Sequence, residues 1–394
     1  MTKTNLVCIF SIAICLLSCS NHDSNSTTDL YPNVTATFSG KIDLNNLSNY
    51  SNQSKPTYIT KDNTAGNPIT DKGATLGRVL FYDKNLSSNN TISCASCHIQ
   101  ANAFGDTEIA STGVNGTTTR HAMRLINSRF ANETKFFWDE RATTLEAQTS
   151  EPIKNHIEMG FSGTSGDGSI STLIAKLQSI GYYKELFKYV YGSEEITENK
   201  LQLALAQFVR SIQSFDSKYD AGRAAVQNDN QPFSNFTAQE NQGKNLFLAP
   251  PVFDANGVRT SGGLGCAGCH APPEFDIDPN TKNNGIIGML NGTGIDVTNT
   301  KAPSLRDLVK SDGTPNGPMM HTGNFTTLQN VIGHYGNITI APRNTNLDPR
   351  LTPNGIGQQL NLTATEVNAL IAFIKTLTGT NVYTDPKWST PFKS

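Results

Sequence analysis

Two short segments hold the side chains with the clearest chemical capacity, TISCASCHIQ at positions 91–100 and GLGCAGCHAP at positions 263–272. Each contains the order Cys-x-x-Cys-His, formed by Cys94, Cys97 and His98 in the first segment and by Cys266, Cys269 and His270 in the second. Two thiols about one helical turn apart can add to the two vinyl groups of one haem, and the adjacent histidine then supplies an axial imidazole. The sequence therefore predicts two covalently bound c-type haems, with His98 and His270 as iron ligands.

Other uses of closely spaced cysteines fit this pattern less well. A redox-active Cys-x-x-Cys disulfide does not require the histidine that both copies carry. A zinc ribbon has cysteine pairs about 15–20 residues apart, whereas most of a domain separates Cys97 from Cys266. Structural disulfides are the usual state of four cysteines in an exported protein. They do not explain why all four cysteines beyond the N-terminal segment lie in the same five-residue motif.

The composition excludes a basic nucleic-acid-binding protein. The chain has 394 residues, of which 37% are hydrophobic and 16% charged, and its formal net charge is −2 at pH 7. Such a chain can bury a core and is long enough for two domains of ordinary size. Because Lys and Arg are not in excess, we expect no cationic face for a polynucleotide.

The N-terminal segment MTKTNLVCIFSIAICLLSC has the pattern of an export signal. A lone Lys3 precedes an apolar run that is too short to span a bilayer. The run ends in LLSC, which resembles the lipobox of bacterial lipoproteins, so we expect removal of residues 1–18 and lipidation of Cys19. The predicted protein is periplasmic and anchored to the membrane as a lipoprotein through Cys19. A soluble periplasmic protein cleaved nearby is the alternative.

A polar segment follows the predicted signal. Ser, Asn and Thr dominate residues 19–60 and large apolar side chains are few, which predicts a disordered tether. Structured sequence is expected from about Asp71, where DKGATLGRVLFYDKNLS leads to the first motif.

The remaining chain repeats one order of features in two halves, residues 61–230 and 231–394. A helical segment precedes each motif, and LGRVLF in the first half has a weak counterpart, QGKNLF, in the second. An amphipathic helix closes each half, with apolar positions at Leu201, Leu205, Phe208 and Ile212 and at Val367, Leu370, Ile371 and Ile374. No convincing alternating run predicts a sheet, so an all-α architecture is expected.

Capping-box spacing predicts three helix starts. The pairs are Thr237 with Glu240, Thr363 with Glu366, and Thr143 with Glu146.

The segment FFWDERATTLEAQTSEPIKNHIEMG follows the first motif and gathers Trp138, Arg141, Gln148 and Glu158. Between His98 and His121 there is no histidine or methionine that could serve as a strong sixth ligand. An electron carrier closes both faces of its iron, whereas a peroxidase keeps one face open with an acid–base group above it. The first haem is therefore expected to have an open face.

This segment resembles the bacterial diheme cytochrome c peroxidases and the related methylamine-utilisation diheme enzyme. The similarity continues through the second motif, APSLRDL, GPMMHTGNFTTLQNVIGHYG and LTATEVNALIAFIKTL, and covers nearly everything after Asp71. The resemblance implies two tandem cytochrome c-like domains with the haems near their interface. The first domain would carry the peroxidatic haem and the second the electron-transfer haem.

The resemblance also implies roles for individual residues. Trp138 would relay electrons between the haems, and Gln148 and Glu158 would line the distal pocket of the first haem. A carboxylate there can take a proton from the peroxide oxygen that binds iron and return it to the departing oxygen. Arg141 would contact a haem propionate, with a plain salt bridge to Asp139 or Glu140 as the alternative. Arg306, in APSLRDL, would also be a haem-binding residue.

The chain departs from the family pattern at the second haem. The classical peroxidases have a methionine on its far side, and the matching position here is Tyr335. A tyrosine ligand resembles the methylamine-utilisation enzyme and would stabilise oxidised iron. The rival ligands are His334, Met289, Met319 and Met320.

Two further departures concern activation and calcium. The classical enzymes have a loop histidine that covers the first haem until reduction, and this chain has none there, so reductive activation is not expected. The calcium-binding asparagine of the family is matched by His121, a poor ligand for a hard cation. The carbonyl oxygens of Asn316 and Pro318 could still bind calcium, and His321 could tune the second site.

The expected reaction is the reduction of hydrogen peroxide to water with electrons from a small cytochrome c or cupredoxin. One alternative is oxidation of a protein or organic substrate through a high-valent diheme state. Another is a non-catalytic electron shuttle. The partners are expected to include no nucleic acid, and a homodimer could form.

Overall fold

Short helices and irregular loops form most of the chain, and the computed structural model describes residues 1, 29–131, 135–277, 281–290 and 294–393. The α-helices are α1 (Pro32–Phe38), α2 (Asp71–Tyr82), α3 (Cys94–Cys97), α4 (Leu145–Ser150), α5 (Ile170–Gln178), α6 (Gly181–Tyr191), α7 (Glu198–Ser211), α8 (Lys218–Ala224), α9 (Ala238–Leu248), α10 (Leu328–Gly336) and α11 (Ala364–Lys375). The strands are β1 (Pro251–Phe253), β2 (Arg259–Gly262), β3 (His270–Ala271) and β4 (Asp276–Ile277), which form two antiparallel pairs. The helical prediction is confirmed in its coarse form, and the two short hairpins were not foreseen.

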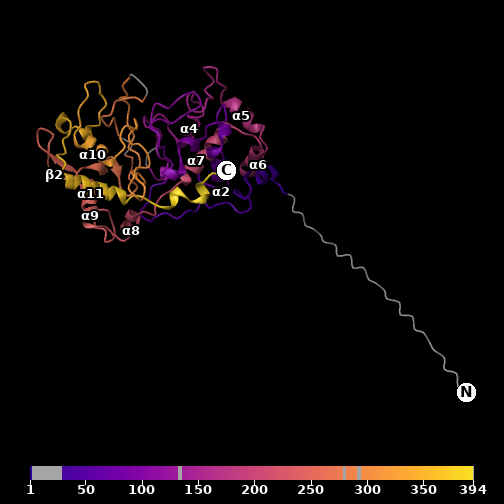
Figure 1. The fold of residues 1–394 in the computed structure, drawn as a ribbon, viewed down its shortest axis with the longest axis horizontal. Helices are drawn as coiled ribbons and strands as arrows, with labels where there is room; N and C mark the ends of the chain where they lie inside the picture. Colours follow the sequence, from indigo (N-terminus) through magenta and orange to yellow (C-terminus); the bar gives the residue numbers. More distant parts are fainter. Residues whose placement is uncertain (2–28, 132–134, 278–280, 291–293, 394) are drawn as a thin grey trace.

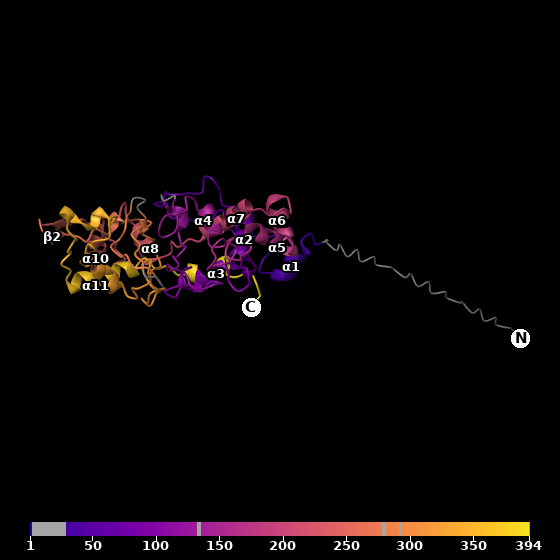
Figure 2. The ribbon, with the colours of Figure 1, turned by 90° about the horizontal axis from the view of Figure 1, so that it is seen from above.

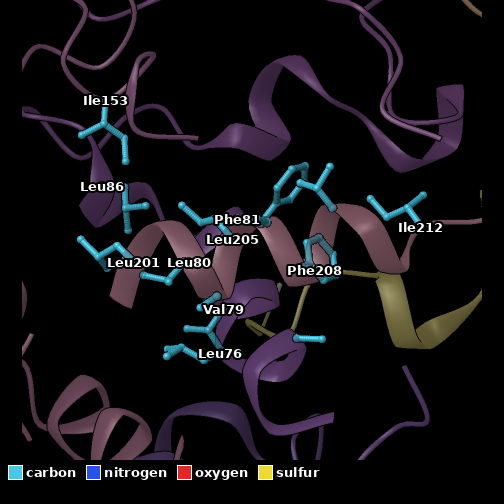
Figure 3. Packing of buried hydrophobic residues seen from close by; sticks show 14 of the residues in the cluster. Leu76, Val79, Leu80, Phe81, Leu86, Ile153, Leu201, Leu205, Phe208 and Ile212 are labelled. Atoms are coloured by element: carbon cyan, nitrogen blue, oxygen red, sulfur yellow. The ribbon is translucent and has the colours of Figure 1, made fainter. Parts of the chain in front are cut away.

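Helices α2 and α7 cross at the centre of the first hydrophobic cluster. Leu76, Val79 and Leu80 recur at helical spacing on α2 and are fully buried, and they pack with side chains of α7 (Figure 3). The two helices approach so closely that a Cβ on Gly77 would lie only 2.0 Å from the carbonyl oxygen of Ala204. Only glycine allows the two backbones to approach in this way.

Helices α9 and α11 repeat this crossing in the second hydrophobic cluster. A Cβ on Gly243 would lie 1.9 Å from the carbonyl oxygen of Ala369 and 2.8 Å from Cβ of Phe373. Gly77 of α2 is placed in the same way, because a Cβ there would meet the Ala204 carbonyl oxygen and Cβ of Phe208, both on α7. These two glycines occupy matching positions in LGRVLF and QGKNLF, so the weak sequence repeat marks a repeated helix crossing.

Two of the three predicted capping boxes are confirmed. Thr237 with Glu240 caps α9, and Thr363 with Glu366 caps α11, each with both reciprocal hydrogen bonds. The third prediction is wrong by one residue. Thr144, not Thr143, accepts the hydrogen bond from the Ala147 backbone at the start of α4. The carboxylate of Glu146 instead forms an ion pair with the guanidinium of Arg210 on α7.

The tether predicted over residues 19–60 is wrong from residue 29 onward, where the structure describes the chain. Helix α1 packs against α6 and buries Val34 and Phe38. The Glu185 carboxylate on α6 accepts hydrogen bonds from the backbone of Asn33 and Val34, at 3.1 and 2.9 Å. A few well-spaced apolar side chains thus suffice to dock a polar segment. Residues 2–28, with the predicted signal and Cys19, lie outside the described residues.

The C-terminal segment returns from the second cluster to the first, as Figures 1 and 2 show for the yellow end of the chain. Val382 and Trp388 are buried in the first cluster. Tyr82 donates a hydrogen bond to the carbonyl of Trp388 at 2.6 Å, and Arg78 donates one to the carbonyl of Ser389 at 2.6 Å. The last residues of the predicted 231–394 domain therefore pack on the other half. In the described part of the chain, no helix has both the length and the hydropathy to cross a membrane.

Candidate active site

The first Cys-x-x-Cys-His motif is a single helical turn. Cys94 to Cys97 form α3, which Ser93 and Ser96 cap reciprocally, and the His98 backbone donates to the Cys94 carbonyl at 2.9 Å. The Nδ1 atom of His98 lies 3.2 Å from the Phe104 carbonyl oxygen. A proton on Nδ1 leaves Nε2 available to an iron atom. Burial lowers the pKa of His98, which favours the neutral imidazole that binds metal.

The second motif begins with a left-handed turn. Gly265, at φ +72°, precedes a 3₁₀ turn over Cys266–Gly268, and His270 follows in β3. Burial lowers the pKa of His270 to about 4, against the effect of the Pro303 and Phe275 carbonyl groups. A cavity of about 680 Å³ opens beside both cysteines and the histidine of this motif. This volume is in the range typical of cofactor sites.

Both donor sets fit a covalently bound haem. The structure joins none of the four cysteines of the two motifs in a disulfide. Each thiol pair adjoins a half-buried histidine whose lowered pKa favours the neutral form, which is the arrangement that thioether attachment and axial ligation require.

We expect haem absorbance to remain with the polypeptide after denaturation and acid–acetone extraction. Thioether bonds survive this treatment, whereas a haem held only by its axial ligand is extracted. The measurement is the absorbance of the extracted, denatured protein, with a Cys266→Ala/Cys269→Ala double variant as the control that should lose about half of it. Complete extraction of haem from the native sequence would contradict the assignment.

The first motif faces a smaller pocket that receives the two predicted distal residues. Gln148 on α4 and Glu158 on the following loop both line it, together with Cys94, Cys97 and His98. Burial raises the pKa of Glu158, and the nearby Arg141 guanidinium opposes this effect. A carboxyl group with a raised pKa in a pocket is suited to proton transfer near neutral pH.

Backbone contacts hold the segment that carries Glu158. The Asn155 side-chain oxygen accepts hydrogen bonds from the backbone of Ile157 and Glu158, at 2.8 and 3.1 Å. On the other side, the Val114 backbone donates to the Glu158 carbonyl at 3.0 Å. A Cβ on Gly113 would lie 2.1 Å from the Ile157 carbonyl oxygen. The loop over residues 111–118 is thus seated directly on the Glu158 segment.

Trp138 lies at the second pocket rather than the first. It lines the larger cavity, and its indole Nε1 donates a hydrogen bond to the His121 carbonyl at 2.7 Å. Its ring centroid is 6.3 Å from that of His321. Both ring nitrogens of His321 are buried and have no hydrogen-bond partner among the described residues.

The structure separates the candidate sixth ligands of the second haem. Tyr335, Met319 and Met320 line the cavity. His334 is not part of the lining, and its Nε2 lies 2.9 Å from the Asn284 carbonyl oxygen. Met289 is exposed at the surface. Burial raises the pKa of Tyr335, so an iron atom would be needed to stabilise its phenolate.

The two predicted haem-contacting arginines have other partners. Arg141 forms an ion pair with Asp139 at 2.9 Å and stacks on Phe137, which favours the plain salt bridge. Arg306 is fully buried, and both of its terminal nitrogens bind the Asp220 carboxylate at 3.0 Å. Arg306 is engaged by this carboxylate and does not line the larger cavity, so the structure gives the predicted haem contact no support.

The residues of the predicted calcium site, His121, Asn316 and Pro318, all lie in the described part of the chain. Asn316 is buried, and its side-chain nitrogen donates to the Asp307 carbonyl and to the Tyr383 hydroxyl, both at 2.8 Å. Pro318 lines the larger cavity. Among the described residues, no group of three or more His, Cys, Asp and Glu side chains is arranged to hold a metal ion.

Sequence reasoning missed two pocket residues. Met159 lines the first pocket beside Glu158, and its position in EMG was a visible signal. Arg124 lines the second pocket although it belongs to the first half of the chain. No local pattern marks Arg124, because the carbonyl that accepts its hydrogen bond belongs to Ser304, 180 residues later in the chain.

Comparisons with known proteins agree with this geometry. A family model described as "Di-haem cytochrome c peroxidase" matches residues 71–229. The methylamine utilization protein MauG of Methylophilus methylotrophus is 30% identical over 322 residues, which are 79% of this chain and 84% of that protein. The cytochrome c551 peroxidase of Nitrosomonas europaea is 28% identical over 320 residues, 78% of this chain and 80% of that protein.

A solved structure has a similar fold. The crystal structure of a MauG-like protein associated with microbial copper homeostasis is 28% identical to this chain. The match covers 86% of this chain and 99% of the other, with a TM-score of 0.66.

Proposed function

Because the chain belongs to the di-haem cytochrome c peroxidase family, whose members include the MauG proteins, we propose that it reduces hydrogen peroxide to water at the first haem site. The family is one of oxidoreductases with two c-type haems. Electrons would enter at the second site, built on Cys266, Cys269 and His270, from a small cytochrome c or cupredoxin. The two halves would be tandem cytochrome c-like domains, a view that the repeated helix crossing supports.

The placement of Glu158 in the pocket of the first motif carries this proposal. A haem held by Cys94, Cys97 and His98 would supply the redox chemistry that reduces peroxide. Glu158 would take a proton from one peroxide oxygen and return it to the oxygen that leaves as water. In total, two electrons from the donor and two protons convert one H₂O₂ into two waters. Gln148 donates a side-chain N–H to the bound peroxide and orients it.

Two other functions have a specific observation in their favour. Tyr335 in the second pocket supports oxidation of a protein or organic substrate, as a MauG-like enzyme would use a hard ligand there. Met159 in the first pocket supports a plain electron carrier, since a thioether ligand would close the open face.

Peroxide turnover with a reduced small cytochrome c, measured together with the spin state of each iron, tests the proposal. We expect catalytic peroxide consumption and one high-spin haem. Two low-spin, six-coordinate irons that are indifferent to peroxide would leave only the carrier function. Slow peroxide turnover, together with accumulation of a stable form of the protein that has lost two electrons, would favour oxidation of a protein or organic substrate.

We also expect peroxide reduction to start without a lag in fully oxidised protein. The loop over residues 111–118 contains no histidine or methionine, and its Val114 and Asn115 backbone nitrogens bind the Glu158 segment at 3.0 and 3.2 Å. Nothing in this loop can therefore cover the iron before reduction. Stopped-flow traces of oxidised and pre-reduced protein, mixed with peroxide and donor, should coincide. A strict requirement for prior reduction would contradict this expectation.

The remaining predictions concern the whole molecule. We propose a periplasmic lipoprotein anchored through Cys19, which mass determination of the mature N-terminus would test. Three further proposals are calcium binding by the carbonyl oxygens of Asn316 and Pro318, electron relay between the haems by Trp138, and formation of a homodimer.

A further inference from the structure

Arg124 is a half-buried cation that forms no ion pair with any of the residues that the structure describes. Its Nη2 donates a hydrogen bond to the Ser304 carbonyl at 3.0 Å. Its Nε is buried and has no partner, and no Asp or Glu of the described chain forms an ion pair with it. Burial lowers the pKa of Arg124 to about 10, although the charge of Asp307 partly opposes this. A buried guanidinium that is only partly satisfied costs several kcal/mol unless an anion accompanies it.

The position of Arg124 is fixed from both halves of the chain. A Cβ on Gly105 would lie 2.8 Å from Cγ of Arg124, so the side-chain stem packs on the turn that follows the first motif. The other end of the side chain donates to the Ser304 carbonyl, and Arg124 lines the second cavity together with Pro303 and Leu305.

The other cations of this cavity have protein partners. Arg350 binds the Asp348 carboxylate at 2.8 Å and the Gly268 carbonyl at 2.7 Å. Lys301 donates to the Lys135 carbonyl at 2.9 Å. A haem bound by Cys266 and Cys269 brings two carboxylates into the same cavity, and a guanidinium is well suited to pair with a carboxylate through two N–H groups.

We propose that Arg124, a residue of the first half, binds a carboxylate of the haem held by the second motif. The ion pair satisfies the buried guanidinium and ties the turn after the first motif to the second haem. This role depends on haem at the second site and does not depend on peroxide turnover.

The resonance Raman spectrum and the midpoint potential of the second haem test this role in the holoprotein. In an Arg124→Gln variant, the haem carboxylate bending band should shift, because its frequency follows the hydrogen bonds to the carboxylate. The potential should fall, because a positive charge near the iron is lost and the oxidised form gains stability. The pKa of the haem carboxyl should rise, because the neighbouring cation had lowered it, so the pH dependence of the potential should move to higher pH.

Arg129→Gln is the matched control, since it removes the same charge from an arginine that is paired with Asp62. Equal spectra and potentials in the two glutamine variants would overturn the proposal. If the Arg124→Gln protein does not retain its second haem, Arg124→Lys replaces it as the test. Lysine keeps the charge but not the fork of N–H groups, so the potential should stay and the band should shift. An unshifted band in the lysine variant would also overturn the proposal. Neither readout needs peroxidase activity, so an inactive protein leaves this test intact.

Discussion

Replacement of Glu158 by Gln is expected to lower peroxide turnover by about 10²- to 10⁴-fold, the usual contribution of a positioned acid–base group. Glutamine is nearly the same size as glutamate and can occupy the same place in the pocket, but it cannot accept and return the proton. The haem content, the spin states and the binding of the electron donor should stay unchanged. Steady-state peroxide consumption with a saturating reduced donor measures the effect.

The pH dependence gives a second test of the same residue. Burial raises the pKa of Glu158 above its ordinary value, and only the deprotonated carboxylate can take a proton from peroxide. Turnover should therefore fall as the pH falls through that raised pKa, and the Glu158→Gln variant should lose this acidic limb.

The control for both measurements is Glu151→Gln. Glu151 is an exposed residue on the same loop that pairs weakly with Lys154 at 3.6 Å. Loss of the Glu151 carboxylate should leave both the rate of peroxide turnover and its pH profile unchanged. A Glu158→Gln enzyme with native turnover would show that another group moves the proton, and the non-catalytic carrier would become the better account.

The haem motifs could be read from the sequence because their chemistry is local. Cys94, Cys97 and His98 need only one helical turn to come together, and that turn is present. The helices α7 and α11 were also predictable, since their apolar positions recur at helical spacing and all but the half-buried Val367 become buried. Gln148 and Glu158 needed the family resemblance, because nothing in their spacing shows that they face the first motif.

Features that depend on contacts between residues far apart in the chain could not be predicted from the sequence. The tether prediction failed because average composition hides individual anchors such as Val34 and Phe38, which pack on a helix about 150 residues away. Arg306 could not be assigned because its partner, Asp220, lies 86 residues earlier in the chain. The local pattern around Thr143 and Glu146 failed because Arg210, from α7, binds the glutamate. In each case a long-range contact outweighs a local rule.

Replacement of Gly243 by Ala is expected to destabilise the protein, although alanine is the better helix former. The new methyl group would lie 1.9 Å from the Ala369 carbonyl oxygen, so α9 and α11 must move apart. Overpacking of this kind costs about 1–3 kcal/mol, occasionally more, and exceeds the helix-propensity gain of about 1 kcal/mol. Gly77→Ala should act alike, because its methyl group would meet the Ala204 carbonyl oxygen on α7. Thermal unfolding of the haem-loaded variants measures the loss.

The matched control is Gly333→Ala on α10, where no atom lies within 4 Å of the added Cβ. This variant should unfold at or slightly above the native temperature, because only the helix-propensity gain remains. Each of these two glycines lies on the α-helix that precedes a haem motif: Gly77 on α2, before α3, and Gly243 on α9, before the Cys266 turn. Separation of either helix pair should therefore also loosen the adjacent haem site, which the absorbance of the corresponding haem would report. Native stability in both crossing variants, with the control unchanged, would mean that the helices can separate at little cost and that the repeated crossing does not hold the two haem sites in place.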